Sequence, residues 1–221
     1  FWDDNFTLDR PRVQEFCRSF KSLDKKLIWW CPNGLHLNTM DNGLLLEMKK
    51  AGCYAIALGI ESGSEKVQKD MNKNLSFGRV KEIVEYAHKI GMRTQGFFII
   101  GYPSEDEKDI LKTIKLSKTL PFLRASFSLF QPIVGSDLYN DLLEKKQLYG
   151  KELNQITCDY SKPSIPTEYI ADVNRIKKLQ SKAILAFYFR PRILFGLLCE
   201  NISFSQLKEL LNIFKKYILG I

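Results

Sequence analysis

Polar residues of the types that bind ligands or take part in catalysis follow directly after apolar runs in this sequence. Glu61 and Ser62 follow the apolar run at 55–60, where a carboxylate is costly unless its surroundings are wet or supply hydrogen-bond donors. Sugar hydroxyls are suitable donors, so we consider Glu61 a candidate ligand-binding residue. The alternative is that Glu61 caps the helix expected after Ser64.

The chain opens with two adjacent carboxylates, Asp3 and Asp4. Such a pair could bind an ammonium group or a metal ion, or could cap the next helix together with Asp9. Lys73 could meet a carboxylate or a phosphate as a point charge, although a lone lysine is commonly a surface residue only. Each of these residues therefore has a chemical and a structural interpretation.

A short motif of Gly101, Tyr102 and Pro103 follows another apolar run. It predicts a rigid turn, in which the missing glycine side chain either lets a flat ligand approach the backbone or serves the turn alone. His36 and His88 have no second histidine or cysteine at ligand spacing, so we predict no zinc site. The five cysteines form no CxxC pair, and we expect reduced thiols.

An alternation of apolar runs and amphipathic helices must position these residues. We expect residues 1–4 to end one strand, and four further apolar runs to form strands. Strands that alternate with amphipathic helices form right-handed βαβ units and a parallel sheet, either a barrel or an open doubly wound sheet. No GxGxxG follows any run, which disfavours a dinucleotide-binding sheet. The four further runs are 27–30, 54–60, 97–100 and 127–130.

The helix boundaries are marked by residues with specific backbone preferences. Gly52 and Gly91 each stand just past a helical stretch, where a left-handed residue is favoured. Ser104 and Glu107 predict a capping box for a helix that Pro121 stops. Chemistry in parallel barrels occurs at the carboxyl ends of the strands. The polar and glycine residues expected at that rim, with the proline of each turn, are Asp3, Asp4, Asn33, Gly34, Glu61, Ser62, Gly63, Gly101, Tyr102, Pro103, Ser104, Glu105, Gln131 and Pro132.

The last third of the chain has a different pattern. A polar stretch with Pro163 and Pro166 begins near Tyr149, and helical periodicity returns from about Tyr169. We therefore divide the chain into residues 1–147, a barrel domain, and residues 148–221, a polar linker with a helical extension. The apolar runs 183–189 and 193–199 are separated by two arginines and a proline, so neither spans a membrane. The apolar face of the last helix is either a packing face or a membrane-surface face.

The composition is that of a folded, water-soluble protein. The 221 residues are 45% hydrophobic and 26% charged, and the net charge is +8. We expect a cytoplasmic location because no signal peptide opens the chain, and the initial Phe1 suggests a truncated start. No run of five or six like charges occurs, so we do not expect a nucleic acid partner.

Three stretches together resemble radical S-adenosylmethionine (SAM) enzymes, especially their cobalamin-binding branch. They are Phe-Trp-Asp-Asp-Asn-Phe-Thr at 1–7, Gly-Ile-Glu-Ser-Gly-Ser at 59–64 with Met71 and Lys73 behind it, and the motif at 96–105 that ends in Gly-Tyr-Pro-Ser-Glu. The sequence at 188–192 also resembles the helical tail of that branch. The resemblance implies a partial parallel (β/α)6 barrel, of which residues 1–147 supply strands two to six.

The resemblance also implies cofactors and residue roles. In this family a CxxxCxxC loop after the first strand holds a 4Fe-4S cluster, and the open iron chelates SAM. The implied contacts are Asp3 and Asp4 with the methionine amino group, Glu61 and Ser62 with the ribose hydroxyls, Lys73 with the carboxylate, Gly101, Tyr102 and Pro103 with the adenine, and Gln131 with Pro132 framing it.

The activity implied by the resemblance is reductive cleavage of SAM to a 5′-deoxyadenosyl radical. The radical would serve methylation or rearrangement of a small-molecule or lipid-like substrate, with cobalamin in the cobalamin branch and a reductant such as flavodoxin or ferredoxin. This sequence contains no CxxxCxxC, so we expect cluster ligands upstream and an inactive isolated chain. The alternatives are a radical methylthiotransferase that acts on RNA, and a cluster-free barrel that serves as a binding or scaffold module.

Overall fold

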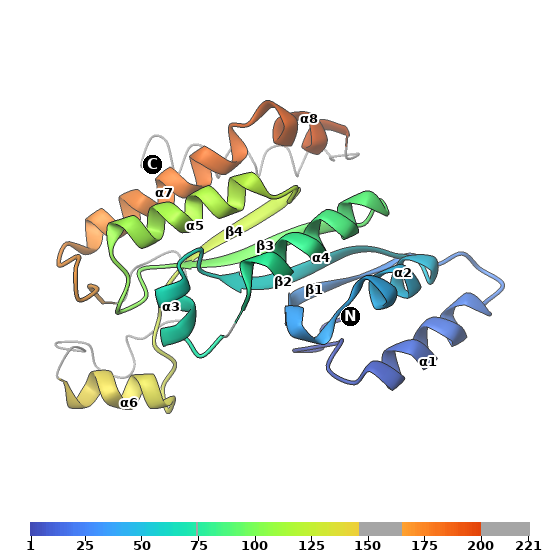
Figure 1. Ribbon diagram of the computed structural model, residues 1–221, viewed down its shortest axis with the longest axis horizontal. Coiled ribbons are helices and arrows are strands. Elements are labelled where there is room, and N and C mark those ends of the chain that lie inside the picture. Colours follow the sequence, from blue (N-terminus) through green and yellow to red (C-terminus); the bar gives the residue numbers. More distant parts are fainter. Residues whose placement is uncertain (74, 146–164, 200–221) are drawn as a thin grey trace.

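A parallel sheet forms the centre of the molecule (Figure 1). The computed structural model describes residues 1–73, 75–145 and 165–199. Within them the sheet has four strands in sequence order, and each strand is parallel to its neighbour. This order lacks the reversal of a doubly wound sheet and is the order of a barrel segment. The strands are β1 (Trp29–Leu35), β2 (Cys53–Glu61), β3 (Arg93–Ile100) and β4 (Arg124–Leu129).

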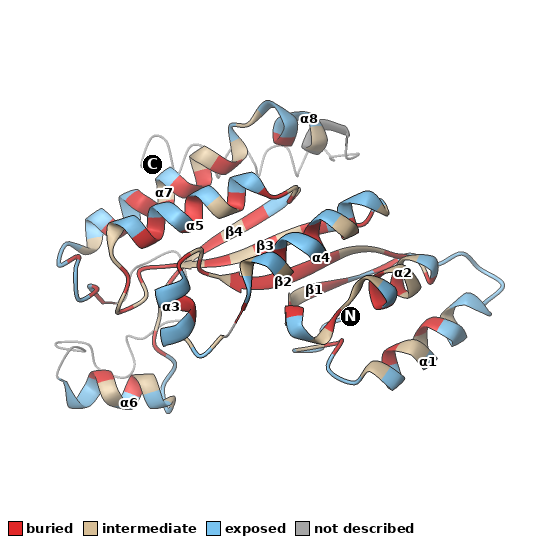
Figure 2. Ribbon diagram, viewed as in Figure 1, coloured by how far each residue is buried: buried red, intermediate tan, exposed pale blue. Residues whose placement is uncertain are grey.

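Helices cover one face of the sheet, as Figures 1 and 2 show. Buried and half-buried residues alternate along β3 and β4, because one side chain in two packs under the helices. The half-buried residues point to the opposite, open face. The covering helices are α2 (Asn42–Lys50), α4 (Phe77–Lys89), α5 (Glu107–Thr119) and α7 (Val173–Tyr188), with α1 (Arg10–Lys21) packed on α2.

Shorter elements occupy the connections. The 3-10 helix η1 (Leu37–Thr39) follows β1, α3 (Glu65–Asp70) follows β2, and α6 (Asp137–Glu144) follows β4. The helix α8 (Pro191–Cys199) continues from α7 after a break at Arg190. None of the helices in the described part of the chain is long and apolar enough to cross a membrane.

Two predicted boundaries at the start of the chain are wrong. Residues 1–4 are not a strand: the amino group of Phe1 donates to the Trp30 carbonyl at 2.9 Å, and the Phe1 ring packs edge-on against Trp29. The strand predicted at 27–30 begins at Trp29 and not at Leu27, because its pairing starts where the Trp29 N–H donates to the Gly52 carbonyl at 3.1 Å. Aromatic packing therefore replaces strand pairing at this edge.

The helix-ending glycines are confirmed, but the predicted capping box is wrong. Gly52 and Gly91 have φ of 94° and 69°, as a left-handed helix end requires. The helix α5 is capped by Asp106, which accepts from the Asp109 N–H at 2.8 Å and donates its own N–H to Asp109. Ser104 lies two residues before the observed cap and donates to the Asp70 carboxylate at 2.5 Å.

The region after β4 continues the architecture of the sheet. The helix expected from about Tyr169 begins at Val173, and α7 packs against β4 and α5. Gln180 donates to the Phe127 carbonyl at 2.7 Å and Tyr188 donates to the Ala125 carbonyl at 2.8 Å, so α7 is bonded to the strand. The predicted division after residue 147 stays a prediction, and the predicted final helix lies outside the described residues.

Candidate functional site

A cavity of about 1050 Å³ opens at the carboxyl ends of the strands, where the sequence predicted the site. Every strand contributes to it, because parallel strands deliver their ends to one rim. The open face of the sheet forms its floor, with Phe97 and Ile99 of β3 next to Ser126 and Ser128 of β4. Other lining residues are Asn33, Glu61, Asp70, Met71, Asn72, Lys73, Phe98, Tyr102, Leu129, Phe130, Gln131, Pro132, Ile133, Ser136, Asp137 and Leu138.

Glu61 is held over this cavity by an unusual backbone. Its φ is 65°, and the register between β2 and β3 shifts between Gly59 and Glu61. Asn72 has φ of 53°, and these two are the non-glycine residues with positive φ in the described part of the chain. Both line the cavity. Such conformations are costly for residues with a Cβ and concentrate at functional sites.

Glu61 and Lys73 form an ion pair inside the cavity wall. The Lys73 Nζ donates to Glu61 Oε1 at 2.9 Å, and the two side chains are 22% and 20% exposed. A Cβ on Gly59 would lie 2.8 Å from Glu61 Oε1 and 3.3 Å from Lys73 Nζ, so the glycine leaves the space that the pair fills. Burial, followed by the charge of Lys73, lowers the pKa of neighbouring His36.

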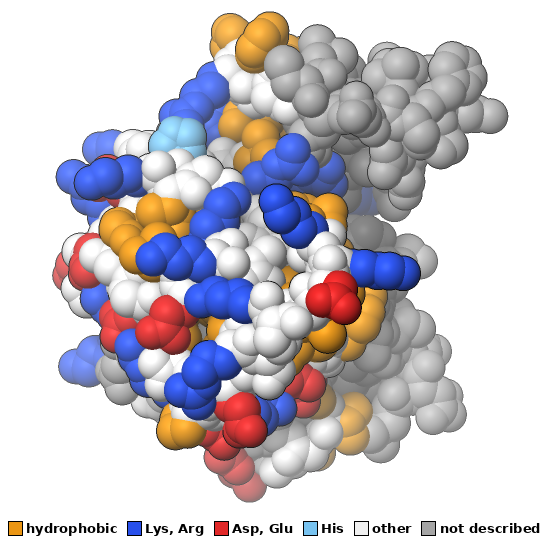
Figure 3. Space-filling view, turned by 90° about the vertical axis from the view of Figure 1, so that its right-hand side faces the viewer, with side chains coloured by type: hydrophobic (Ala, Val, Ile, Leu, Met, Phe, Trp, Pro, Cys, Tyr) orange, Lys and Arg blue, Asp and Glu red, His pale blue; other side chains and the backbone are white. Residues whose placement is uncertain are grey.

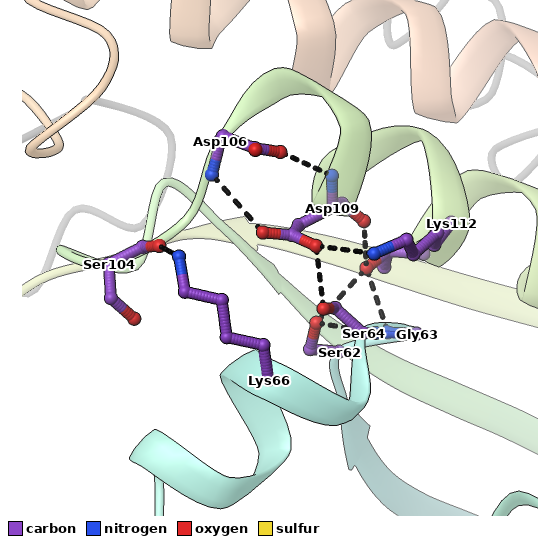
Figure 4. Close-up of polar contacts among 9 residues, drawn as sticks. Ser62, Gly63, Ser64, Lys66, Ser104, Asp106, Asp109 and Lys112 are labelled. Carbon is purple, nitrogen blue, oxygen red and sulfur yellow. Dashed lines mark hydrogen bonds and ion pairs between the residues drawn. The ribbon is translucent and has the colours of Figure 1, made fainter.

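Ser62 points away from the cavity and fixes the loop after β2 to α5 (Figure 4). It is fully buried, and its hydroxyl lies 3.2 Å from that of Thr113, which accepts from the Gly63 N–H at 2.8 Å. Ser64 donates to Asp109 at 2.6 Å, and Lys112 donates to the same oxygen at 2.8 Å. The loop that carries Glu61 is thus bonded to the first turns of α5.

The turn after β3 presents Tyr102 to the cavity. Gly101 has φ of 84°, and a Cβ there would lie 2.7 Å from Ile176 Cγ2 of α7. The space beside the glycine is therefore filled by α7, which supports the tight-turn alternative rather than an approaching ligand. The Tyr102 ring lies edge-on to Phe130 at 5.2 Å, and its hydroxyl donates to the Asp70 carbonyl at 3.3 Å.

Two other residues hold this turn from outside the cavity. Pro103 is buried and accepts from the Glu168 N–H at 2.7 Å. Glu105 is buried beneath the turn and accepts from the Gly101 N–H at 2.7 Å through Oε2, whereas its Oε1 has no partner. Burial raises the pKa of Glu105 to about 8, against hydrogen bonds from Gly101 and Tyr102 that lower it. The carboxyl group is therefore protonated at neutral pH.

The two N-terminal carboxylates lie outside the cavity. Asp3 pairs with Arg12 at 2.9 Å, and Asp4 is exposed. Asp9 caps α1 by accepting from the Arg12 N–H at 3.1 Å. The sequence left open that Asp3, Asp4 and Asp9 cap this helix, and Asp9 is the one that does so. Asn33, which lines the cavity, donates to the Trp2 and Asp3 carbonyls at 3.0 and 3.1 Å. The first residues are thus tied to the rim through their backbone.

The structure brings together six of the residues predicted for the rim or the cofactor, and it adds others. Asn33, Glu61, Lys73, Tyr102, Gln131 and Pro132 line the cavity. The alternation Ala-Ser-Phe-Ser-Leu in β4 is a sequence signal for two serines on one face, and it would have identified Ser126 and Ser128. Asp70 and Asn72 carry no such signal, because the end of α3 places Asp70 and the left-handed backbone of the following loop places Asn72.

The described residues contain no group of three or more His, Cys, Asp and Glu side chains that could hold a metal ion. Cys17, Cys31 and Cys53 are buried and free, and burial raises the pKa of Cys17 to about 11. A buried thiol with a raised pKa is a poor thiolate ligand. The described part of the chain therefore does not fit a 4Fe-4S cluster, and the expectation of ligands elsewhere stays a prediction.

A family model described as the Radical SAM superfamily matches residues 3–117, more than half of the chain. The chain belongs to the radical SAM superfamily. The matched residues include all of β1, β2 and β3 and most of α5, so the fold and the family agree. The predicted family, the predicted parallel α/β fold of partial barrel type and the prediction of an enzyme family are confirmed.

Two relatives are methyltransferases by name. The chain is 27% identical over 217 residues to an uncharacterized methyltransferase of Pyrococcus horikoshii, covering 98% of this chain and 46% of the relative. It is 35% identical over 150 residues to the cytidylyl-2-hydroxyethylphosphonate methyltransferase of Streptomyces wedmorensis, covering 65% of this chain and 28% of the relative. The chain therefore spans less than half the length of either relative.

A solved structure with the same fold is TsrM from Kitasatospora setae, a radical SAM methyltransferase determined with cobalamin and a 4Fe-4S cluster bound. The TM-score is 0.59 at 14% identity, and the match covers 68% of this chain and 29% of TsrM. This similarity supports the radical SAM fold of the chain.

Proposed function

We propose that this chain forms the SAM-binding wall of a radical SAM enzyme that methylates a small molecule. In this family SAM, once bound to its cluster, supplies a radical or a methyl group. The observation that carries the proposal is the Glu61–Lys73 pair, held over the cavity by a left-handed residue. The methyltransferase relatives support the type of reaction.

The chemistry of the cavity suits the groups that SAM presents. In the proposal Glu61 accepts hydrogen bonds from the ribose hydroxyls, and Lys73 binds the carboxylate. Tyr102, Gln131 and Pro132 frame the adenine at the other side of the rim. Ser62, Gly101 and Pro103 act through the loops that they hold, because other protein groups occupy their surroundings.

The whole protein requires further components. We propose a 4Fe-4S cluster held by residues outside the described part of this chain, cobalamin as in TsrM, and a flavodoxin or ferredoxin as the reductant. In the proposal the substrate is a small molecule or a lipid-like molecule, and the protein is located in the cytoplasm. A cavity of about 1050 Å³ is large enough for a cofactor and part of a substrate.

The test is the affinity for SAM of the intact, cluster-loaded protein and its Glu61→Gln variant. We expect the variant to bind SAM about tenfold more weakly or worse, because an amide loses the charge-assisted hydrogen bonds of a carboxylate. The control is Glu85→Gln on α4, which makes the same chemical change at an exposed ion pair with Lys81. Equal affinity of the Glu61→Gln variant and the wild type would refute the assignment of Glu61.

A further inference from the structure

The end of the sheet opposite the cavity is rich in exposed cations. Arg93 begins β3 and Arg124 begins β4 at this end, and both are exposed. The last turns of α2, α4 and α5 reach the same end and carry Lys50, Lys89 and Lys118, all exposed. Helix C-termini favour cations, which accounts for the three lysines, and the Arg93 guanidinium lies 6.0 Å from the centroid of the Tyr54 ring.

The corner between α7 and α8 lies beside these cations. Arg190 donates to the Lys118 carbonyl at 2.6 Å and to the Phe187 carbonyl at 2.9 Å, so the corner is bonded to the end of α5. An Arg192 nitrogen lies 3.2 Å from a ring nitrogen of His88, near the end of α4. We name the exposed residues Lys50, Lys89, Arg93, Lys118, Arg124 and Arg192 the basic end.

Large apolar side chains are exposed at the same corner. Phe189 is 56% exposed, Leu194 is 38% exposed and Phe195 is 70% exposed, whereas Ile193 between them is buried. Figure 3 faces this end of the molecule and shows Lys and Arg side chains over much of the surface, with hydrophobic side chains between them. Exposed aromatic and aliphatic side chains beside lysine and arginine are typical of surfaces that bind lipid headgroups.

We propose that the basic end and the α7–α8 corner dock on an anionic membrane surface. The cations complement acidic headgroups, while Leu194 and Phe195 enter the boundary between headgroups and acyl chains. RNA would also attract the cations and stack on a phenylalanine, but the aliphatic Leu194 has no stacking function. The cavity lies at the other end of the strands, so docking leaves its mouth open to a water-borne substrate.

The test is cosedimentation of the intact protein with vesicles of phosphatidylcholine alone or with phosphatidylserine added. We expect the wild type to bind the anionic vesicles at least tenfold better than the neutral ones, and less well as salt is raised. The double variant Lys118→Glu with Arg192→Glu should lose that preference, and Phe195→Ser should weaken binding several-fold. Phe195 is 70% exposed, so its replacement leaves the core intact.

The matched control is Lys108→Glu, which reverses an exposed charge at the opposite end of the same helix as Lys118. It should bind anionic vesicles as the wild type does. The single variant Lys118→Glu is a second test in case the double variant misfolds. It should fold, because the Arg190 side chain donates to the backbone carbonyl of Lys118 and not to its side chain. Equal binding of the wild type to both vesicles would overturn the proposal, as would undiminished binding of the double variant. Binding to transfer RNA in place of vesicles, lost in the double variant, would assign the surface to RNA instead.

Discussion

At the scale of single residues, Glu61 shows how function and backbone strain coincide. A glutamate at φ of 65° is disfavoured, and the bonds around it maintain the conformation from both sides. Lys73 holds its carboxylate, while the buried hydrogen bonds of Ser62 and Ser64 fix the following residues. Glu61 was predictable as a site residue because a carboxylate after an apolar run demands partners. Its backbone conformation was not, since it depends on α5, which lies far along the chain.

Glu105 gives a pH prediction at the same scale. Its ordinary pKa is 4.5, and burial raises it to about 8 in the folded protein. Between these values the unfolded chain has lost this proton and the folded chain keeps it. The free energy of unfolding should therefore fall as pH rises from about 4.5 to about 8, by up to about 1.4 kcal/mol per pH unit.

The measurement is urea unfolding of the wild type and of Glu105→Gln at pH 5, 6, 7 and 8. The amide has no proton to lose and its oxygen can still accept from Gly101, so the variant should lack this part of the pH dependence. Glu85→Gln, at an exposed carboxylate, should keep the wild-type slope. Parallel pH profiles for the wild type and Glu105→Gln would show that Glu105 is ionised in the folded protein.

At the scale of elements, the contact between the loop after β2 and α5 positions the site. A Cβ on Gly63 would lie 2.6 Å from Thr113 Cα and 2.7 Å from the Lys112 carbonyl oxygen. Gly63→Ala should therefore push α5 and the loop apart and lower the free energy of unfolding by about 1–3 kcal/mol. Denaturant unfolding measures this change.

The matched control for that substitution is Gly78→Ala in the first turn of α4. A Cβ there would have its nearest neighbour at 3.5 Å, and alanine favours a helix over glycine. This variant should be as stable as the wild type or slightly more stable. If Gly63→Ala matched it, the close backbone contact between the loop and α5 would not exist in solution.

Local rules predicted those elements whose signals lie within a few residues. The glycines that end α2 and α4 and the apolar runs of β2 and β3 needed only their neighbours in sequence. The start of β1 and the cap of α5 were wrong by two residues each, and β3 and β4 begin four and three residues earlier than predicted. The β1 strand begins at Trp29 because the Trp29 N–H donates to the Gly52 carbonyl, and Ser104 donates to the Asp70 carboxylate instead of capping α5. Both of these boundaries therefore depend on residues that are distant in the sequence.

At the scale of the whole molecule, the parallel sheet separates two surfaces of different character. Its carboxyl end carries the cavity with a glutamate, a lysine and aromatic side chains, and its amino end carries the basic end. The sequence predicted the first surface because the order of strands and helices decides where the strand ends meet. It did not predict the second, because the cations come from elements that are separated in sequence and meet only in the fold.

The measurement that tests the central claim most directly is a crystal structure of the intact, cluster-loaded protein with SAM bound. We expect SAM in the cavity at the carboxyl ends of the strands, with its ribose hydroxyls within hydrogen-bond distance of Glu61 and its adenine beside Tyr102. SAM bound elsewhere, with the Glu61–Lys73 pair facing only solvent, would contradict the account.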